Sequence, residues 1–296
     1  MNFLKARYVC IFISLAVIIT GIVMGLNENF KLDIDFLGGT KIQVDLKQDF
    51  TNEEIEKLVK EITGVNPLVQ KLSSGQSSVA ISTSPISEEL SNKIVDKINE
   101  VYVNSDEPII KNIQPAFGRE LIDSAVIAIL VSIILLLIYI IIRFKTLGVS
   151  AAITAILALV HDALFIVAIY GIFGLPINST FVAVILTIIG YSINDTIVVY
   201  DRIRENRRKV TRSDDLKDTI NLSLTQTLKR TIFTSITTLI AIVSIYVFAY
   251  INNQQVLQEF SFPLTIGVLV GTYSSIFIAS SLWYEIDRLI HKAKKA

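Results

Sequence analysis

The sequence has few of the side chains on which most enzymes depend. Its 296 residues include one cysteine, Cys10, and two histidines, so a disulfide within the chain is excluded. The phosphate-binding pattern GxxxxGKS/T, the zinc-protease pattern HExxH and the hydrolase pattern GxSxG are all missing. The 27 basic and 27 acidic residues balance. We expect no catalytic residue, metal, cofactor or nucleic-acid partner, and the chain is not expected to be an enzyme.

Hydrophobic residues are what the chain has in excess. They make up 52% of the sequence, and the mean hydropathy is +0.57. A helix needs about 20 apolar residues to cross a bilayer. Six runs approach or exceed that length, at residues 8–26, 120–142, 147–171, 179–201, 229–250 and 260–284. The composition therefore predicts an α-helical integral membrane protein with six transmembrane helices.

The distribution of lysine and arginine predicts the orientation of these helices. Basic residues gather at 5–7, 143–145, 202–212 and 288–295, whereas the connections GIFGLPINST and INNQQVLQ contain none. Because cytoplasmic connections carry an excess of Lys and Arg, both termini are expected in the cytoplasm. The long polar stretch after the first helix is then expected on the outer side of the membrane.

That polar stretch alternates strand and helix patterns. Residues 42–46 alternate apolar and polar side chains as a half-buried strand does, and Thr51 and Glu54 form a capping-box pattern before an amphipathic helix. The order strand, helix, two strands, helix, strand predicts an extracytoplasmic ferredoxin-like α+β domain. The expected organisation is a cytoplasmic N-terminus and first helix at 1–26, this domain at 27–118, helices two to six at 119–284 with a basic cytoplasmic loop at 202–228, and a cytoplasmic tail at 285–296.

Two ionisable residues inside the apolar runs are the main candidates for function. A charged residue at membrane depth is costly, so Asp195 and Arg230 each suggest a functional site. Asp195 shares a helical face with Tyr191, and Arg230 forms a comparable stripe with Thr234 at a compatible depth. A carboxylate that alternates between pairing with Arg230 and separation from it binds and releases a proton. Ion coupling is one interpretation, and a fixed ion pair that locks two helices is the other.

Two further patterns have a functional and a structural interpretation. His161 and Asp162 are adjacent near the middle of the third apolar run, where they suit either a proton relay or a hydrogen-bonded pair that fixes two helices. Gly267 and Gly271 form a GxxxG pattern, which is typical of close helix packing.

Two other classes of function fit parts of the pattern. An intramembrane aspartyl protease would need Asp195 to converge with Asp162 or Asp201 on one substrate carbonyl. The expected depths of Asp162 and Asp195 differ by about two helical turns, which disfavours this alternative. A half-transporter for lipids or hydrophobic solutes is the second alternative, and it would need a roomy apolar cavity between the spans.

Several longer motifs resemble the SecD/SecF family of the resistance-nodulation-division superfamily. They are LDIDFLGGT (32–40), QPAFGREL (114–121), ALVHD (158–162), GYSINDTIVVYDRIREN (190–206), LKRTIFTSITT (228–238) and GTYSSIFIASSLW (271–283). In the first motif, Asp35, Gly38, Gly39 and Thr40 follow the family pattern. Asp33 stands where the family usually has glycine, and Leu37 where threonine or lysine is common.

The resemblance implies a function in protein export from bacteria. The expected role is an accessory subunit of the Sec translocase in the bacterial inner membrane, which uses a proton or sodium gradient to promote export after ATP-driven translocation. Asp195 matches the intramembrane acid of the family, Arg230 matches a basic residue linked with ion coupling, and His161 and Asp162 match a recurrent pair. The implied partners are SecD, the SecYEG channel, YajC and the preprotein. Membrane lipids are a further expected partner, because the basic run RIRENRRKVTR suits either contact with anionic lipid or a topology signal.

Overall fold

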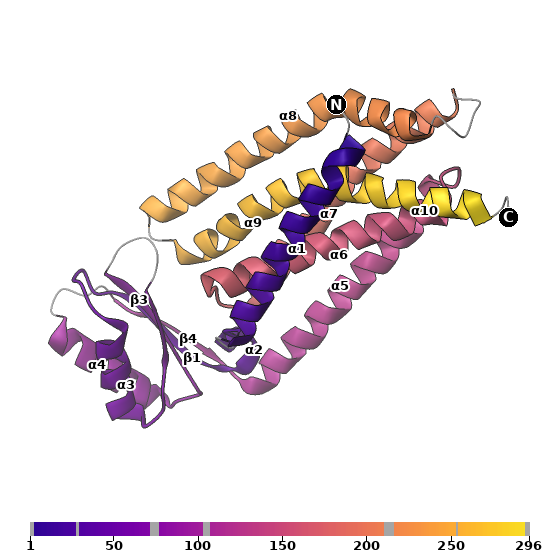
Figure 1. Cartoon of the computed structure of the whole chain (residues 1–296). Helices are drawn as coiled ribbons and strands as arrows, with labels where there is room; N and C mark the ends of the chain where they lie inside the picture. The colour runs from indigo at the N-terminus through magenta and orange to yellow at the C-terminus, as the bar shows by residue number, and fades with distance from the viewer. Residues whose placement is uncertain are drawn as a thin grey trace.

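Six helical segments of the computed structural model are long and apolar enough to cross a membrane, among the residues that the structure describes, namely 3–27, 30–71, 77–102, 107–209, 216–252 and 254–293 (Figure 1). Five are single helices: α1 (Phe3–Asn27), α5 (Pro115–Arg143), α6 (Val149–Phe173), α7 (Ser179–Arg207) and α8 (Leu216–Ile251). The sixth is a continuous run of α9 (Gln255–Tyr273), the π-helical turn η2 (Ser274–Ala279) and α10 (Ser280–Ala293). The prediction of six membrane-spanning helices is confirmed by length and composition.

Helices also occupy most of the stretch that the sequence predicts as a basic loop at 202–228. α7 continues to Arg207, and α8 begins at Leu216. The first turns of α8 bury Ile220 and Leu224 against the bundle together with the small polar residues Thr219 and Ser223, while Lys217 and Asp218 are exposed. This amphipathic extension is too polar for a hydropathy run to detect. Parts of the basic stretches at 202–212 and 288–295 lie outside the described residues.

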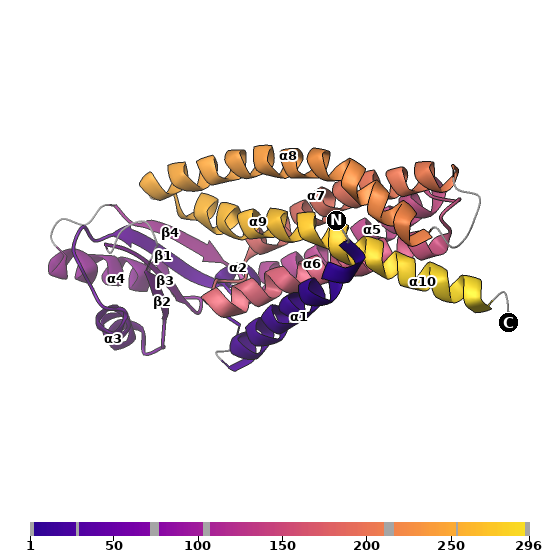
Figure 2. The ribbon, with the colours of Figure 1, turned by 45° about the horizontal axis from the view of Figure 1, so that its top comes forward.

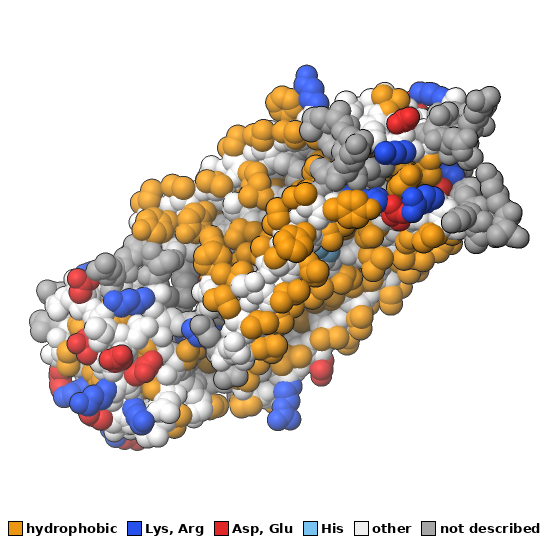
Figure 3. All heavy atoms as spheres, in the orientation of Figure 1, with side chains coloured by type: hydrophobic (Ala, Val, Ile, Leu, Met, Phe, Trp, Pro, Cys, Tyr) orange, Lys and Arg blue, Asp and Glu red, His pale blue; other side chains and the backbone are white. Residues whose placement is uncertain are grey.

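The helices differ strongly in how much of their surface is covered. α6, α7 and α9 form the centre of the bundle and supply most of its buried core, whereas α5 and α8 leave most of their apolar side chains exposed. Figures 1 and 2 show α8 along one border of the bundle, next to α9. In Figure 3 hydrophobic side chains cover the middle of the molecule, and charged side chains gather at its two ends. This distribution is expected for a bundle surrounded by lipid.

A four-stranded antiparallel sheet lies at one end of the bundle, between α1 and α5 in chain order (Figure 1). Its strands are β1 (Gly39–Asp45), β2 (Leu68–Lys71), β3 (Ser78–Thr83) and β4 (Ile109–Ile113), in the order β2-β3-β1-β4. Helix α3 (Asn52–Thr63) follows β1, and α4 (Glu88–Val101) follows β3. We call residues 39–113 the sheet domain.

The two faces of the sheet have different partners. In β1 the alternate residues Ile42 and Val44 join a core with Ile55 of α3 and Ile94 of α4. Because side chains alternate along a strand, the residues between them, such as Gln43, face the opposite way. That second face is polar and is turned toward the ends of the membrane helices. The predicted capping box at the start of α3 is present, with both Thr51–Glu54 hydrogen bonds formed.

Candidate functional site

Asp195 is buried past the midpoint of α7. Its side chain is 1% exposed, and its Oδ2 atom has no hydrogen-bond partner among the described residues. Arg230 on α8 is exposed at the surface of the bundle. No hydrogen bond or ion pair joins the side chains of Asp195 and Arg230 among the described residues. The two side chains are therefore in the separated arrangement.

A chain of hydroxyl groups lies beside Asp195. Tyr191, one turn earlier on α7, donates to the Ser235 hydroxyl of α8 at 3.1 Å, and Ser235 bonds the Thr272 hydroxyl of α9 at 2.7 Å. Thr234 does not join this chain, because its hydroxyl donates to the carbonyl of Arg230 in its own helix. Tyr191 therefore links three helices, whereas Thr234 makes a local contact.

Asp162, which is itself fully buried, is the centre of a second polar cluster. Its Oδ2 accepts hydrogen bonds from Ser192 of α7 at 2.6 Å and from Ser274 of η2 at 2.8 Å. Its Oδ1 lies 2.9 Å from Nδ1 of His161. The other ring nitrogen of His161 contacts the Tyr273 hydroxyl at 3.2 Å, and Tyr273 in turn bonds Ser14 of α1. Both oxygens of Asp162 therefore have partners, and the cluster joins four helical segments.

The acids required for a protease do not meet. Asp162 is committed to the cluster just described, and Asp201 forms ion pairs with Arg143 at 2.5 Å and with Arg204 at 2.7 Å. No hydrogen bond joins Asp195 to either acid in the described part of the chain. The two acids of an aspartyl protease must share one substrate carbonyl, and this arrangement does not provide that.

The motif after α1 lies where the sheet domain meets the bundle. Asp35 is in a short helix, α2 (Ile34–Leu37), and its carboxylate bonds residues from two other elements. Lys111 of β4 donates to Oδ1 at 2.8 Å. Ser179, the first residue of α7, donates to Oδ2 from its backbone nitrogen at 3.1 Å and from its hydroxyl at 2.5 Å.

These contacts change the acidity of Asp35. Burial raises the pKa of its carboxyl, but the hydrogen bonds from Lys111 and Ser179 outweigh burial and hold the pKa below its ordinary value. The carboxylate also lies at the N-terminus of α7, where the helix dipole favours a negative charge. Asp35 is therefore held in its ionised form by groups outside its own helix.

The neighbouring motif residues shape the same junction. Gly38 has a φ of 73°, and a Cβ atom there would lie 2.5 Å from the Cα of Pro115 at the start of α5. A Cβ at Gly39 would lie 2.2 Å from the carbonyl of Thr83 in β3. The Thr40 hydroxyl accepts from the backbone nitrogen of Ile86 at 3.4 Å. The junction thus requires glycine at both positions, since side chains there would displace backbone atoms.

Asp33, the departure from the family pattern, has partners of its own. It caps α2 through a hydrogen bond from the Ile34 nitrogen and forms a buried ion pair with Lys41 of β1 at 2.8 Å. An aspartate thus has a structural use at a position where the resemblance leads one to expect glycine.

Gly267 and Gly271 lie where α9 crosses α7. A Cβ atom at Gly267 would lie 2.1 Å from Cδ1 of Ile188, and one at Gly271 would lie 3.0 Å from Cβ of Ser192. The structure therefore places both glycines of the GxxxG pattern at one helix crossing, opposite side chains of α7.

Sequence reasoning missed several residues of these clusters. Lys111 and Ser179 complete the site of Asp35, and Ser192 and Ser274 complete that of Asp162. Each lies far along the chain from the acid it contacts, and serine is common in membrane helices. No local pattern marks such a residue, so only the tertiary structure identifies it.

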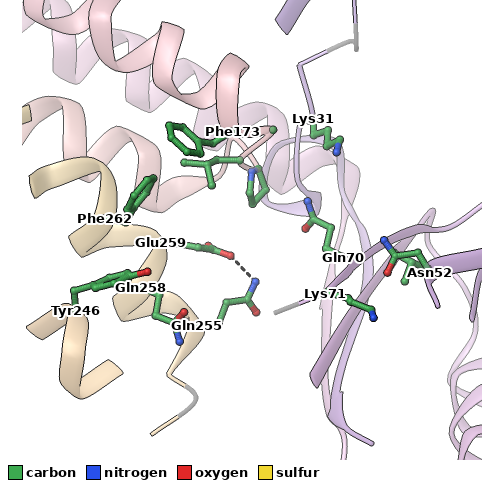
Figure 4. A pocket seen from close by; sticks show the side chains of 14 residues that line it. Lys31, Asn52, Gln70, Lys71, Phe173, Tyr246, Gln255, Gln258, Glu259 and Phe262 are labelled. Atoms are coloured by element: carbon green, nitrogen blue, oxygen red, sulfur yellow. Dashed lines mark hydrogen bonds between the residues drawn. The ribbon is translucent and has the colours of Figure 1, made fainter. Parts of the chain in front are cut away.

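A hollow of about 520 Å³ opens beside the junction, between β2 and the ends of α8 and α9 that lie next to the sheet domain (Figure 4). Glu259 and Gln255 of α9 are hydrogen-bonded to each other in its lining, and the aromatic rings of Phe173, Tyr246 and Phe262 line one side. No group of three or more His, Cys, Asp or Glu side chains able to hold a metal occurs among the described residues.

Comparison with known proteins gives consistent matches. The family model "Protein export membrane protein SecD/SecF, C-terminal" matches residues 87–289. The protein translocase subunit SecF of Petrotoga mobilis is 32% identical over 100% of this chain and 99% of its own length. SecF of Borreliella burgdorferi is 35% identical, over 98% of each chain.

Longer relatives contain a similar region as one part. The protein translocase subunit SecDF of Bacillus subtilis is 37% identical over 94% of this chain, which spans 37% of that protein. The crystal structure of SecDF from Thermus thermophilus, described as a translocon-associated membrane protein, superposes with a TM-score of 0.85 at 29% identity. That match covers 97% of this chain and 39% of the other.

Proposed function

The chain belongs to the SecD/SecF family of protein export membrane proteins, and from this premise we propose that it is a SecF-like accessory subunit of the Sec translocase. It uses a transmembrane proton or sodium gradient, together with SecD, to promote preprotein export after ATP-driven translocation. The observation that carries the proposal is the buried carboxyl of Asp195, whose Oδ2 has no hydrogen-bond partner in the described part of the chain. A half-transporter for hydrophobic solutes is the weaker alternative.

The membrane topology follows from charge and fold. Both termini lie in the cytoplasm, because the basic residues of the connections gather on that side. The sheet domain is a ferredoxin-like α+β domain outside the cytoplasm, in a bacterial inner membrane protein. Its strand order and its two helices on one face support this assignment.

Ion coupling rests on two arrangements of α7 and α8. When Asp195 pairs with Arg230, the charged carboxylate is favoured, and when they separate, a buried carboxyl without a partner favours ion uptake from its surroundings. The observed arrangement is the separated one. Exchange between the two would bind and release an ion and shift α7 relative to α8.

The His161–Asp162 pair has a different role. Both oxygens of Asp162 have partners on three helical segments, and none of these partners is Asp195 or Arg230. A buried polar network in which both carboxyl oxygens have partners holds the surrounding helices in one arrangement. We assign the pair to locking α6 against α7 and η2, and not to carrying the ion.

A partner membrane protein covers the exposed helices. The apolar side chains of α5 and α8 are mostly uncovered, which leaves two long faces for a second helical subunit. SecD is the proposed partner, as the fused SecDF relatives suggest. The SecYEG channel, YajC, the preprotein and membrane lipids complete the proposed surroundings.

Replacing Asp195 by Asn tests the function. Asn keeps the shape of the side chain but cannot ionise, so export of a preprotein is expected to fall to the level of cells that lack the protein. Asp123→Asn, which removes an exposed carboxyl near the sheet-domain end of α5, is the matched control. Membrane levels of both variants are compared by immunoblot. Export by the Asp195→Asn variant at the level of the control would refute ion coupling.

A further inference from the structure

The sheet domain has two covalent connections to the bundle, and neither involves the helix that carries Asp195. Its N-terminal end follows α1 through α2, and its C-terminal end enters α5 directly. α7 is not directly connected to the sheet domain in the chain, and its described hydrogen bonds lead there through Asp35 of α2. A displacement of α7 therefore reaches the sheet domain through non-covalent contacts.

The main such contact is the carboxylate of Asp35. One of its oxygens bonds Lys111 of β4, and the other bonds the backbone and hydroxyl of Ser179 at the start of α7. A single side chain therefore joins an edge strand of the sheet to α7. Asp35 is 6% exposed, and hydrogen bonds to a buried charged group are stronger than those between neutral groups.

Backbone contacts reinforce the same connection. The nitrogen of Asp33 donates to the carbonyl of Ile177 at 3.0 Å, and the nitrogen of Ile177 donates to the carbonyl of Lys31 at 2.8 Å. Ile177 lies two residues before α7. The segment that precedes the sheet domain and the segment that precedes α7 are thus paired side by side.

We propose that Asp35 is a positioning residue that fixes the sheet domain to α7, so that a shift of α7 during ion coupling moves the sheet domain with it. The inference rests on the proposed function, because it gives a role in ion coupling to the outer end of α7, whose inner part carries Asp195. Ser179 and Asp195 are separated by about 24 Å along α7 at about 1.5 Å per residue. A helix of this length transmits a displacement as a nearly rigid rod.

The space around this connection permits such a movement. At the β2 edge of the sheet, opposite the β4 edge that Asp35 contacts, the hollow of about 520 Å³ separates β2 from the ends of α8 and α9 (Figure 4). The sheet domain reaches α9 there through a hydrogen bond between Gln43 and Gln255. A domain that is held firmly at Asp35 and loosely at the hollow can tilt without repacking its core.

The connection has two halves, the bond from Asp35 to Lys111 of β4 and the bonds from Asp35 to Ser179 of α7, and three substitutions test them separately. Asp35→Asn weakens both halves, Lys111→Met removes the contact to β4, and Ser179→Ala removes one contact to α7 while it keeps the backbone bond. Asp45→Asn is the matched control, because Asp45 lies in β1 and its carboxylate accepts a hydrogen bond from the backbone nitrogen of Lys47 within the sheet domain. Each variant is produced together with SecD in cells that lack the native copy, and membrane levels are compared.

The measurements are preprotein export in cells and ion entry into right-side-out membrane vesicles under an imposed proton or sodium gradient. The three variants are expected to lose export while they keep ion entry at the native level, because α7 still shifts but no longer moves the sheet domain. Asp45→Asn is expected to keep both. Asp195→Asn is expected to lose both.

Two results would overturn the inference. Export by Asp35→Asn and Ser179→Ala equal to that of Asp45→Asn would show that the connection is not needed. A joint fall of export and ion entry in these variants would show a general structural defect instead of lost transmission. If Asp195→Asn kept both export and ion entry, the proposed function itself would be refuted, and this inference with it.

Discussion

Gly267→Ala is expected to destabilise the bundle by about 1–3 kcal/mol, the usual cost of overpacking a core. The new Cβ would lie 2.1 Å from Cδ1 and 2.5 Å from Cγ1 of Ile188. Ordinary contact begins at 3.4 Å, so Cδ1 must retreat by at least 1.3 Å. Ile188 is 1% exposed and packs within the buried core of the bundle. Since both of its outer atoms clash, either the whole side chain rotates or α9 moves away from α7.

The assay is thermal unfolding of the purified protein in detergent, where about 1 kcal/mol corresponds to roughly 2–4 °C for chains of 150–250 residues. Gly190→Ala is the matched control, because Gly190 lies on α7 near Ile188 and a Cβ there meets nothing within 4 Å. In an Ile188→Ala background the cost of Gly267→Ala should largely disappear, because the added methyl fills vacated space. Equal melting temperatures for the two glycine variants, or additive effects in the double variant, would refute the reasoning.

Two further predictions concern the buried acids. Asp162→Asn is expected to lower stability by about 1.5–3 kcal/mol, because hydrogen bonds to a charged group are lost, whereas Ser274→Ala should cost about 1 kcal/mol; equal melting temperatures for the two variants would contradict this. The ionised form of Asp35 is favoured in the folded protein, so its contribution is present above the ordinary carboxyl pKa and is lost as the pH falls through the lowered pKa. The difference in melting temperature between the native protein and Asp35→Asn should therefore shrink as the pH is lowered from 6 to about 3, and a constant difference would contradict the assignment.

Local patterns account for much of the fold. Thr51 and Glu54 predict the start of α3 because capping depends on residues three positions apart. The alternation around Ile42 predicts β1 and its buried face, since neighbouring side chains on a strand point in opposite directions. The long apolar runs predict the membrane helices, because a membrane-spanning helix is marked by one continuous segment of apolar residues. The extension of α8 escaped this reasoning because tertiary contacts of Ile220 and Leu224 stabilise an otherwise polar helix.

The candidate sites depend on contacts that no local pattern contains. Asp35 and Ser179 are 144 positions apart, so their hydrogen bonds follow from the way α2 and α7 are brought together. Asp195 and Arg230 were recognisable because ionisable residues are rare in membrane helices. Their sequence positions did not determine whether they form a pair, since that depends on the rotation of α8. The role of these residues in ion coupling therefore stays a prediction.

The π-helical turn η2 makes the length of the chain critical at one point. A π-helical turn holds an extra residue relative to a regular α-helix. Before this turn, Gly267 of α9 lies opposite Ile188 of α7. After it, the ring of Trp283 in α10 lies beside Tyr200 and under the guanidinium of Arg207, which are both in α7. Deleting one residue between Ser274 and Ala279 would turn α10 by about 100° relative to α9. A relative that lacks this residue would direct other side chains toward α7, even if every remaining residue were identical.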